Sequence, residues 1–213
     1  MRKYWLLTIA LMLLLSAYLA NPLAYHLPIS YSQVGATELS NPLANCYSEG
    51  VVAANRLWCL LYEREKLMKE VAANKYQYQQ KKPIYDGARE LEVLSKVADN
   101  AQKKQLPVRD VQLYAQIVMD VSRQIQQHWF DVWEEQESLP PTLSLNQIRE
   151  RIDLIDTAIL DSFVLMRDND PITLQQLQDG LRESFADLEG IHPSQDATLF
   201  TDLLAKAILR IEN

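Results

Sequence analysis

The chain has 213 residues, 48% of them apolar, and is therefore long enough to bury the core of one domain. Glycine is scarce (5 residues) and Leu, Ala, Gln and Glu are abundant, which favours helices and argues against a β-sandwich. The formal net charge of −7 argues against binding nucleic acid. An anionic ligand would need a local cluster of cations.

The N-terminus is typical of an exported protein. Arg2 and Lys3 precede an uncharged run at residues 4–20, YWLLTIALMLLLSAYLA. A basic start, an apolar stretch and small residues at its end predict a signal peptide over residues 1–20, with an uncleaved membrane anchor as the alternative. Cleavage would change the net charge from −7 to −9. We expect a periplasmic or secreted protein that meets the membrane only during export, with residues 21–37 as a linker.

The two cysteines leave two options open. In an oxidising compartment Cys46 and Cys59 could form a disulfide. On one continuous helix they would lie ~20 Å apart, which is too far for a bridge. A disulfide therefore requires the helix to begin after Cys46. The three histidines are scattered and no CxxC pattern occurs, so no metal site is predicted.

The first helical pattern runs from about residue 38 to residue 80. Its apolar stripe includes two cations, Arg64 and Lys75, which are close to three turns apart and so share a face, with Cα atoms ~16 Å apart. Pro83 ends the pattern. A second helix is expected from Asp86, a potential N-cap, to about residue 105. Its inward positions are predicted as Leu91, Leu94, Val97, Ala98 and Ala101.

A third helix is predicted over residues 108–136, where Ser122 and Gln126 interrupt an apolar face one turn apart. A fourth begins after Ser144, which forms a capping-box pattern with Gln147. Arg149 lies beside the core face of that helix. Its core face is predicted as Ile148, Ile152, Ile155, Ile159, Phe163 and Met166.

Two shorter helices are expected over about residues 173–188 and 197–211, and no segment predicts a strand. The fold class is therefore all-α, a bundle of about six helices.

Several cations stand at or beside core positions: Arg64, Lys75, Arg89 and Arg149. One such cation alone is usually ion-paired or reaches the solvent. Glu90 is the one acid near these four cations, and too few other acids lie on the same helix faces to neutralise them. Because unpaired buried charge is costly, a bound dianion is expected to supply the missing charge. The alternative is a structural bundle with surface ion pairs.

Four sequence blocks resemble the all-helical (type II) chorismate mutases, and among them the secreted gamma subclass. EREKLMKEVAANK at residues 63–75 is similar to the family pattern RL.LM..VA..K, and PIYDGARE at residues 83–90 to PI.D..RE. DVSRQIQ at residues 120–126 is similar to..SK.IQ. LNQIRERID at residues 145–153 resembles the segment in which the secreted subclass supplies a further active-site arginine. The blocks follow the family order and span about half of the chain.

The resemblance implies roles for the cations and for one amide. Arg64, Arg89 and Arg149 would bind the substrate carboxylates, and Arg149 would take the place of an arginine that short dimeric relatives borrow from a partner. Lys75 would contact a carboxylate and the ether oxygen of the substrate. Gln126 would donate a hydrogen bond to the same ether oxygen.

The remaining matched positions are polar. Asp86 pairs with Arg89 in the family pattern, Glu90 would accept a hydrogen bond from the ring hydroxyl, and Ser122 would lie near a carboxylate. Asn74 departs from the family, which usually has an aromatic residue there. Tyr76 stands where many relatives have Trp.

The implied reaction is the rearrangement of chorismate to prephenate, without cofactor or metal, in a protein expected to be a homodimer. Residues 38–138 would form the mutase core of three helices, and residues 139–213 would complete the pocket. Since Gln is always neutral, activity is expected to be flat from about pH 5 to about pH 9. The alternatives are an isochorismate pyruvate-lyase activity, or a non-catalytic exported helical binding module or effector.

Overall fold

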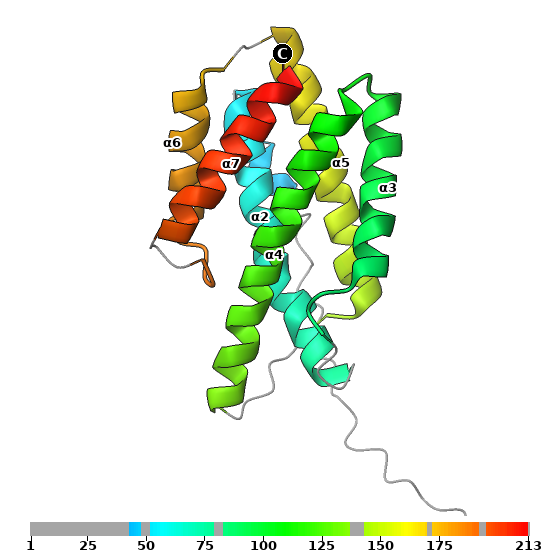
Figure 1. The fold of residues 1–213 in the computed structure, drawn as a ribbon, viewed down its shortest axis with the longest axis vertical. Coiled ribbons are helices and arrows are strands. Elements are labelled where there is room, and N and C mark those ends of the chain that lie inside the picture. Colours follow the sequence, from blue (N-terminus) through cyan, green and yellow to red (C-terminus); the bar gives the residue numbers. More distant parts are fainter. Residues whose placement is uncertain are drawn as a thin grey trace, which may run out of the picture. The chain divides into compact units, whose positions relative to one another are not determined.

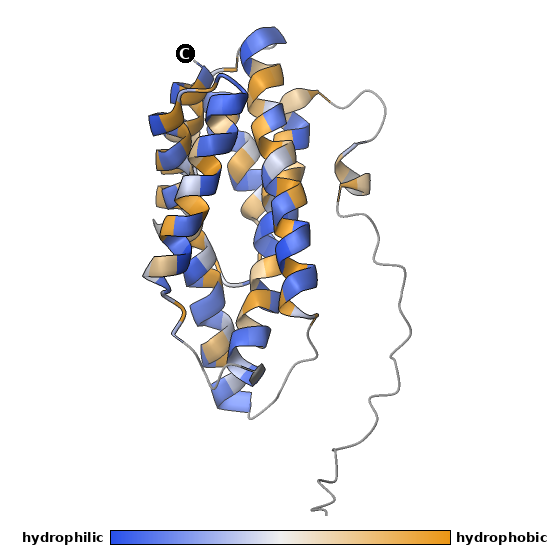
Figure 2. Cartoon of the chain, turned by 90° about the vertical axis from the view of Figure 1, so that its right-hand side faces the viewer, coloured by the Kyte–Doolittle hydropathy of each residue, from blue (hydrophilic) through white to orange (hydrophobic). Residues whose placement is uncertain are grey.

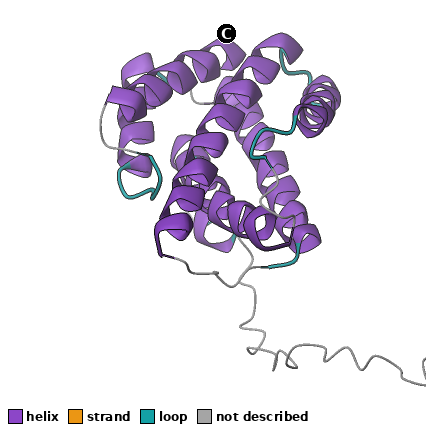
Figure 3. Cartoon of the chain, turned by 60° about the horizontal axis from the view of Figure 1, so that its bottom comes forward, coloured by secondary structure: helices purple, strands orange, loops and turns teal. Residues whose placement is uncertain are grey.

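The computed structural model describes six stretches of the chain: residues 43–47, 52–78, 83–136, 143–169, 172–191 and 195–212. The predicted signal peptide and linker lie outside them. All regular structure in these stretches is helical, and the described part contains no strand (Figure 3). Within the same ranges no helix is both long and apolar enough to cross a membrane.

In the part of the chain that the structure describes, six α-helices follow one short 3₁₀ helix, as the sequence pattern predicted for the fold class (Figure 1). They are η1 (Ala44–Cys46), α2 (Ala53–Tyr78), α3 (Gly87–Lys103), α4 (Val108–Gln136), α5 (Leu145–Asn169), α6 (Leu174–Phe185) and α7 (Gln195–Glu212). Most of their predicted ends are correct to within a few residues.

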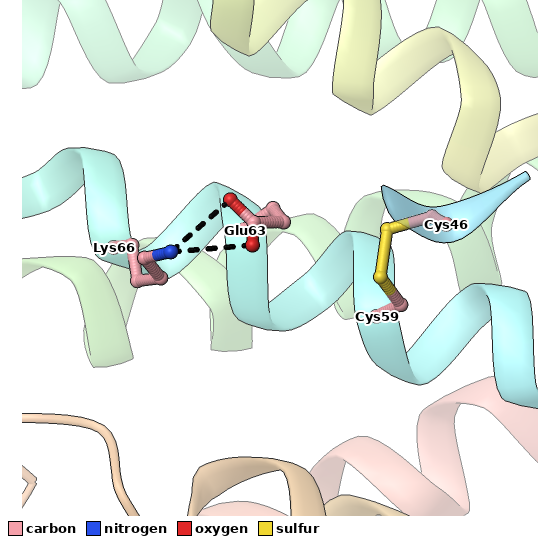
Figure 4. The surroundings of a disulfide bond; sticks show 4 residues. All are labelled: Cys46, Cys59, Glu63 and Lys66. Carbon is pink, nitrogen blue, oxygen red and sulfur yellow. Dashed lines mark hydrogen bonds and ion pairs between the residues drawn. A yellow bond between two sulfur atoms is a disulfide. The ribbon is translucent and has the colours of Figure 1, made fainter. Parts of the chain in front are cut away.

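The predicted start of the first helix, near residue 38, was wrong. The helix α2 begins at Ala53, after the separate η1. Cys46 therefore lies outside α2, and Cys46 and Cys59 form a disulfide with Cα atoms 5.5 Å apart (Figure 4). One continuous helix through both cysteines would forbid this distance.

Side-chain caps define where three helices begin. Asp86 accepts a hydrogen bond from the backbone N–H of Arg89 at 3.2 Å, at the start of α3. Ser144 forms the predicted capping box with Gln147 before α5. Thr173 makes the same motif before α6. These caps satisfy N–H groups that the first helical turn leaves without a partner.

The helix α2 packs against α4, α5 and α6, while α4 also contacts α3 and α7. Apolar and polar residues alternate around the helices, as expected for amphipathic elements (Figure 2). The predicted core face of α5 is buried, except that Ile152 is half-buried, and Ser122 and Gln126 of α4 are buried as well. The packing of α2 against α5 and of α4 against α7 joins the segments before and after residue 138, and the boundary proposed there stays a prediction.

The inner face of α3 was predicted incorrectly at one position. Leu91 is 70% exposed, and Ala101 is the single fully buried residue of this helix. The helix contacts α4 extensively and α5 only slightly. Val93 and Val97 instead line a cavity, so the face of α3 turned towards the bundle borders open space rather than core.

Candidate active site

A cavity of about 400 Å³ lies among α2, α3, α4 and α5 of the single chain. This volume falls within the range of about 300–1,000 Å³ usual for small-molecule pockets. The lining includes all eight residues predicted as site residues: Arg64, Lys75, Asp86, Arg89, Glu90, Ser122, Gln126 and Arg149. The four sequence blocks therefore converge on one place.

Arg64 is buried in a cluster of polar side chains that come from three helices. Its Nε donates to Asp156 Oδ1 on α5 at 2.8 Å, and its Nη1 donates to Glu65 Oε1 at 2.6 Å. Nη1 also donates to Ser122 Oγ on α4 at 2.9 Å. Nη2 has no acceptor among the described residues and is not one of the fully buried polar atoms. Because Arg64 lines the cavity, Nη2 is its candidate donor to a ligand there.

Burial and charge perturb the ionisable groups of this cluster. Burial lowers the pKa of Arg64, but attraction to Asp156 and Glu65 outweighs it and raises the pKa overall. Burial raises the pKa of the Glu65 carboxyl despite the neighbouring Arg64. Burial also raises the pKa of Tyr114, whose buried hydroxyl has no partner among the described residues. A ligand oxygen beside Tyr114 would satisfy this donor.

The expected shortage of acids was wrong. Six cationic and five acidic side chains line the cavity. Glu90 accepts from Arg123 Nη1 at 2.6 Å, and Arg89 pairs with Glu92 at 2.7 Å. A helical stripe shows which residues share a face of one helix. It does not show which acids on a second helix lie opposite a cation. It also does not show an acid at the neighbouring position of the same helix that pairs with it.

Two polar side chains face the cavity from α2 and α4. Lys75 Nζ donates to the carbonyl of Ile84 at 2.8 Å, which places the ammonium beside the start of α3. Gln126 Nε2 donates to the Ser122 carbonyl at 3.1 Å and to Met68 Sδ at 3.8 Å. A thioether is a weak acceptor, so a ligand oxygen would compete well for the second hydrogen of Gln126.

Glu70 and Asn74 hold the start of α5, and with it Arg149, against α2. Asn74 Nδ2 donates to the Leu143 carbonyl at 3.3 Å, and Glu70 Oε2 accepts from the Leu143 N–H at 3.2 Å. The departure from an aromatic residue at Asn74 therefore has a structural use.

The second departure is also explained by packing. Tyr76 makes edge-to-face contacts with Phe130 and Trp133 of α4, with ring centroids 5.3 Å and 5.7 Å away. Such aromatic pairs stabilise beyond the area that they bury. Tyr76 thus fastens the end of α2 to α4, near Lys75.

Sequence reasoning missed four residues of the site: Glu65, Tyr114, Arg123 and Asp156. Glu65 stands immediately after Arg64, where the family pattern has Leu, and this apolar-to-acidic change was a usable signal. Arg123 stands at the Lys position of the pattern..SK.IQ, which was a second usable signal. No pattern in the sequence singles out Tyr114 or Asp156.

Parts of this chain are similar to known proteins. Residues 55–127 match the family described as "Chorismate mutase type II". A "Monofunctional chorismate mutase" of Enterobacter agglomerans is 32% identical over 122 residues, which cover 57% of this chain. The chain spans 65% of the length of that relative.

Two crystal structures share the fold. The chorismate mutase of Burkholderia phymatum matches with a TM-score of 0.59 and 19% identity, over 71% of this chain and 93% of the other. The enzyme of Burkholderia thailandensis matches with a TM-score of 0.53 and 21% identity, over 76% and 99%.

Proposed function

The chain has the chorismate mutase type II fold, and from this premise we propose that it is a chorismate mutase, an isomerase that converts chorismate to prephenate. The observation that carries the proposal is the convergence of all eight predicted residues on one cavity built by one chain. The family match at residues 55–127 and the curated relative support the same activity.

The reaction is an intramolecular rearrangement in which the ether C–O bond breaks as a C–C bond forms. Substrate and product are isomers, so the atoms balance without a second reactant. Partial negative charge develops on the ether oxygen in the transition state. Lys75 and Gln126 would donate hydrogen bonds to this oxygen, and donors aimed at developing charge lower the barrier.

The arginines would hold the two carboxylates of the substrate in the reactive geometry, which removes entropy from the barrier. The Nη2 group of Arg64 and the side chains of Arg89 and Arg149 are the candidates. Arg89 would first leave Glu92, a partly exposed pair of a kind worth about 0–1 kcal/mol. Glu90 would be held by Arg123 in position to accept from the ring hydroxyl.

The test is an assay of chorismate loss by ultraviolet absorbance with the purified full-length chain. Arg89→Ala and Gln126→Ala should each lower kcat/KM by about two orders of magnitude or more. Arg109→Ala is the matched control, since Arg109 is exposed on α4 and does not line the cavity. A chain that leaves chorismate unchanged refutes the proposal. In a second assay with isochorismate as the substrate, its cleavage to pyruvate and salicylate would support the lyase alternative.

We also propose that the protein is exported and belongs to the secreted gamma subclass. Support comes from the apolar run at residues 4–20 and from the disulfide Cys46–Cys59, since disulfides persist in oxidising compartments. Fractionation of a bacterial host and the intact mass of the soluble periplasmic protein test this. A mature N-terminus near residue 21 is expected, and a full-length chain in the membrane pellet would indicate an anchor instead.

We further propose a homodimer in which each cavity is complete within its own chain. Leu199 and Leu203 lie one turn apart on α7 and are both exposed, which suits an apolar contact with a second copy. Light scattering should report twice the mass of the chain. The double variant Leu199→Glu, Leu203→Glu should halve that mass and keep the activity; a monomeric wild type contradicts the assembly.

A further inference from the structure

Glu65 is an enclosed carboxyl beside the cavity that the proposed reaction does not use. Its side chain is 1% exposed. Oε1 accepts from Arg64 at 2.6 Å, and Oε2 accepts from Ser122 Oγ at 2.9 Å. A buried ionised carboxylate is costly unless it is paired, and here its partner is the arginine expected to bind the ligand.

The charges of this cluster do not balance once a ligand arrives. Arg64 carries one positive charge, whereas Glu65 and Asp156, both in contact with it, carry two negative charges when ionised. A ligand carboxylate at Arg64 Nη2 would add a third negative charge in the same buried region. Repulsion between like charges in a poorly solvated site would then oppose binding.

We propose that the substrate dicarboxylate enters the cavity together with one proton, which Glu65 takes up. This inference rests on the proposed mutase function and adds to it a coupling between substrate binding and pH. Glu65 acts through Arg64 and Ser122 and does not itself touch the substrate, so it is a positioning residue.

Ser122 shows how the proton would help. Its hydroxyl has one hydrogen, which it donates to Glu65 while its oxygen accepts from Arg64 Nη1. Once Glu65 is protonated, the carboxyl O–H donates to Ser122 Oγ instead. The Ser122 hydrogen is then released and can turn towards a ligand carboxylate in the cavity that Ser122 lines.

Several titratable groups face the Glu65 carboxyl: Arg64 on its own helix, Tyr114 on α4 and Asp156 on α5. Asp156 is the competing proton acceptor. Its side chain is 28% exposed, so water already stabilises its charge, whereas both oxygens of Glu65 are enclosed. The raised pKa of Glu65, caused by burial, agrees with this choice.

The coupling predicts a split between binding and chemistry. KM for chorismate should rise with pH, by up to about tenfold per pH unit over the range in which Glu65 is ionised in the free protein but protonated in the complex. The kcat at saturating chorismate should stay flat, because Gln126 does not titrate. A purely structural role of Glu65 would not separate the two constants in this way.

Calorimetry with prephenate as the probe measures the proton directly. Titrations over a series of pH values, each in two buffers of different ionisation enthalpy, give the number of protons taken up. For the wild type this number should rise towards one per ligand in the pH range where Glu65 is ionised in the free protein and protonated in the complex. Glu65→Gln keeps the shape and a hydrogen-bond acceptor but cannot be protonated. It should bind without proton uptake and with a KM independent of pH.

Asp156→Asn is the matched variant and should keep the proton uptake. Loss of uptake in Asp156→Asn with retention in Glu65→Gln would assign the proton to Asp156 and overturn the inference. Wild-type binding without proton uptake would also overturn it, while turnover of chorismate would leave the proposed function standing. A chain that neither turns over chorismate nor binds prephenate would overturn both. If Glu65→Gln fails to fold, the wild-type uptake and Asp156→Asn decide.

Discussion

Replacing Gln126 tests the proposed electrostatic role of the cavity most directly. The side chain is 5% exposed, and Nε2 uses one hydrogen on the Ser122 carbonyl and the other on Met68 Sδ. To donate to a substrate oxygen, Nε2 has to give up only the weak hydrogen bond to Met68 Sδ. Removing one donor to developing negative charge costs about 10²–10³ in kcat, and Gln126→Ala should lose about this much at every pH.

Gln126→Glu should convert a flat kcat profile into a sloping one. The new carboxyl has nearly the same shape but donates only when protonated, so kcat should fall by up to about tenfold per pH unit above its pKa. The assay is kcat at saturating chorismate from about pH 5 to about pH 9. Gln127→Glu, at the exposed neighbouring position, is the control and should stay flat. A flat profile for Gln126→Glu, or near wild-type kcat for Gln126→Ala, would refute the role assigned to this amide.

Two further predictions concern stability. A Cβ at Gly180 would come within 2.4 Å of the Trp58 indole, so Gly180→Ala should lower the free energy of unfolding by about 1–3 kcal/mol in a denaturant titration. Gly87→Ala, whose Cβ meets only the exposed ring of Tyr85, should cost clearly less, and equal losses would contradict this account. Burial raises the pKa of Glu212 to about 7, because the folded state favours the neutral carboxyl. The contribution of this carboxyl to folding stability is therefore full at acidic pH and is lost as the pH rises through about 7. Glu212→Gln should therefore stabilise the fold by about 1 kcal/mol at alkaline pH, after allowance for partial solvent screening, and should have little effect below the usual carboxyl pKa. A gain of the same size at acidic pH would refute this.

Caps and prolines predicted most helix ends well, because each such signal depends on only a few neighbouring residues. Asp86 and Ser144 cap the helices that they were expected to cap, and Pro83 precedes the start of α3. The predicted start of α2 was wrong because the helical pattern extends before Ala53, whereas Cys46 belongs to the separate η1 and is joined to Cys59 by a disulfide.

The cavity lining was predictable for a different reason. Motif matching selected residues on four separate helices, and the fold brought all eight to one place. The ion pairs were not predictable, since no spacing within one helix could show that Asp156 meets Arg64 or that Arg123 meets Glu90. Glu65 was overlooked because it lies one position off the stripe that was followed.

The contacts of Glu70 and Asn74 with Leu143 predict whether two inactive variants can restore activity when they are mixed. They fasten the helix that carries Arg149 onto the helix that carries Arg64 within the same polypeptide. If catalysis needs both arginines, a chain lacking one of them cannot be rescued by a chain lacking the other. Mixtures of two such defective chains should stay inactive at any protein concentration. The specific activity of the wild type should stay constant on dilution.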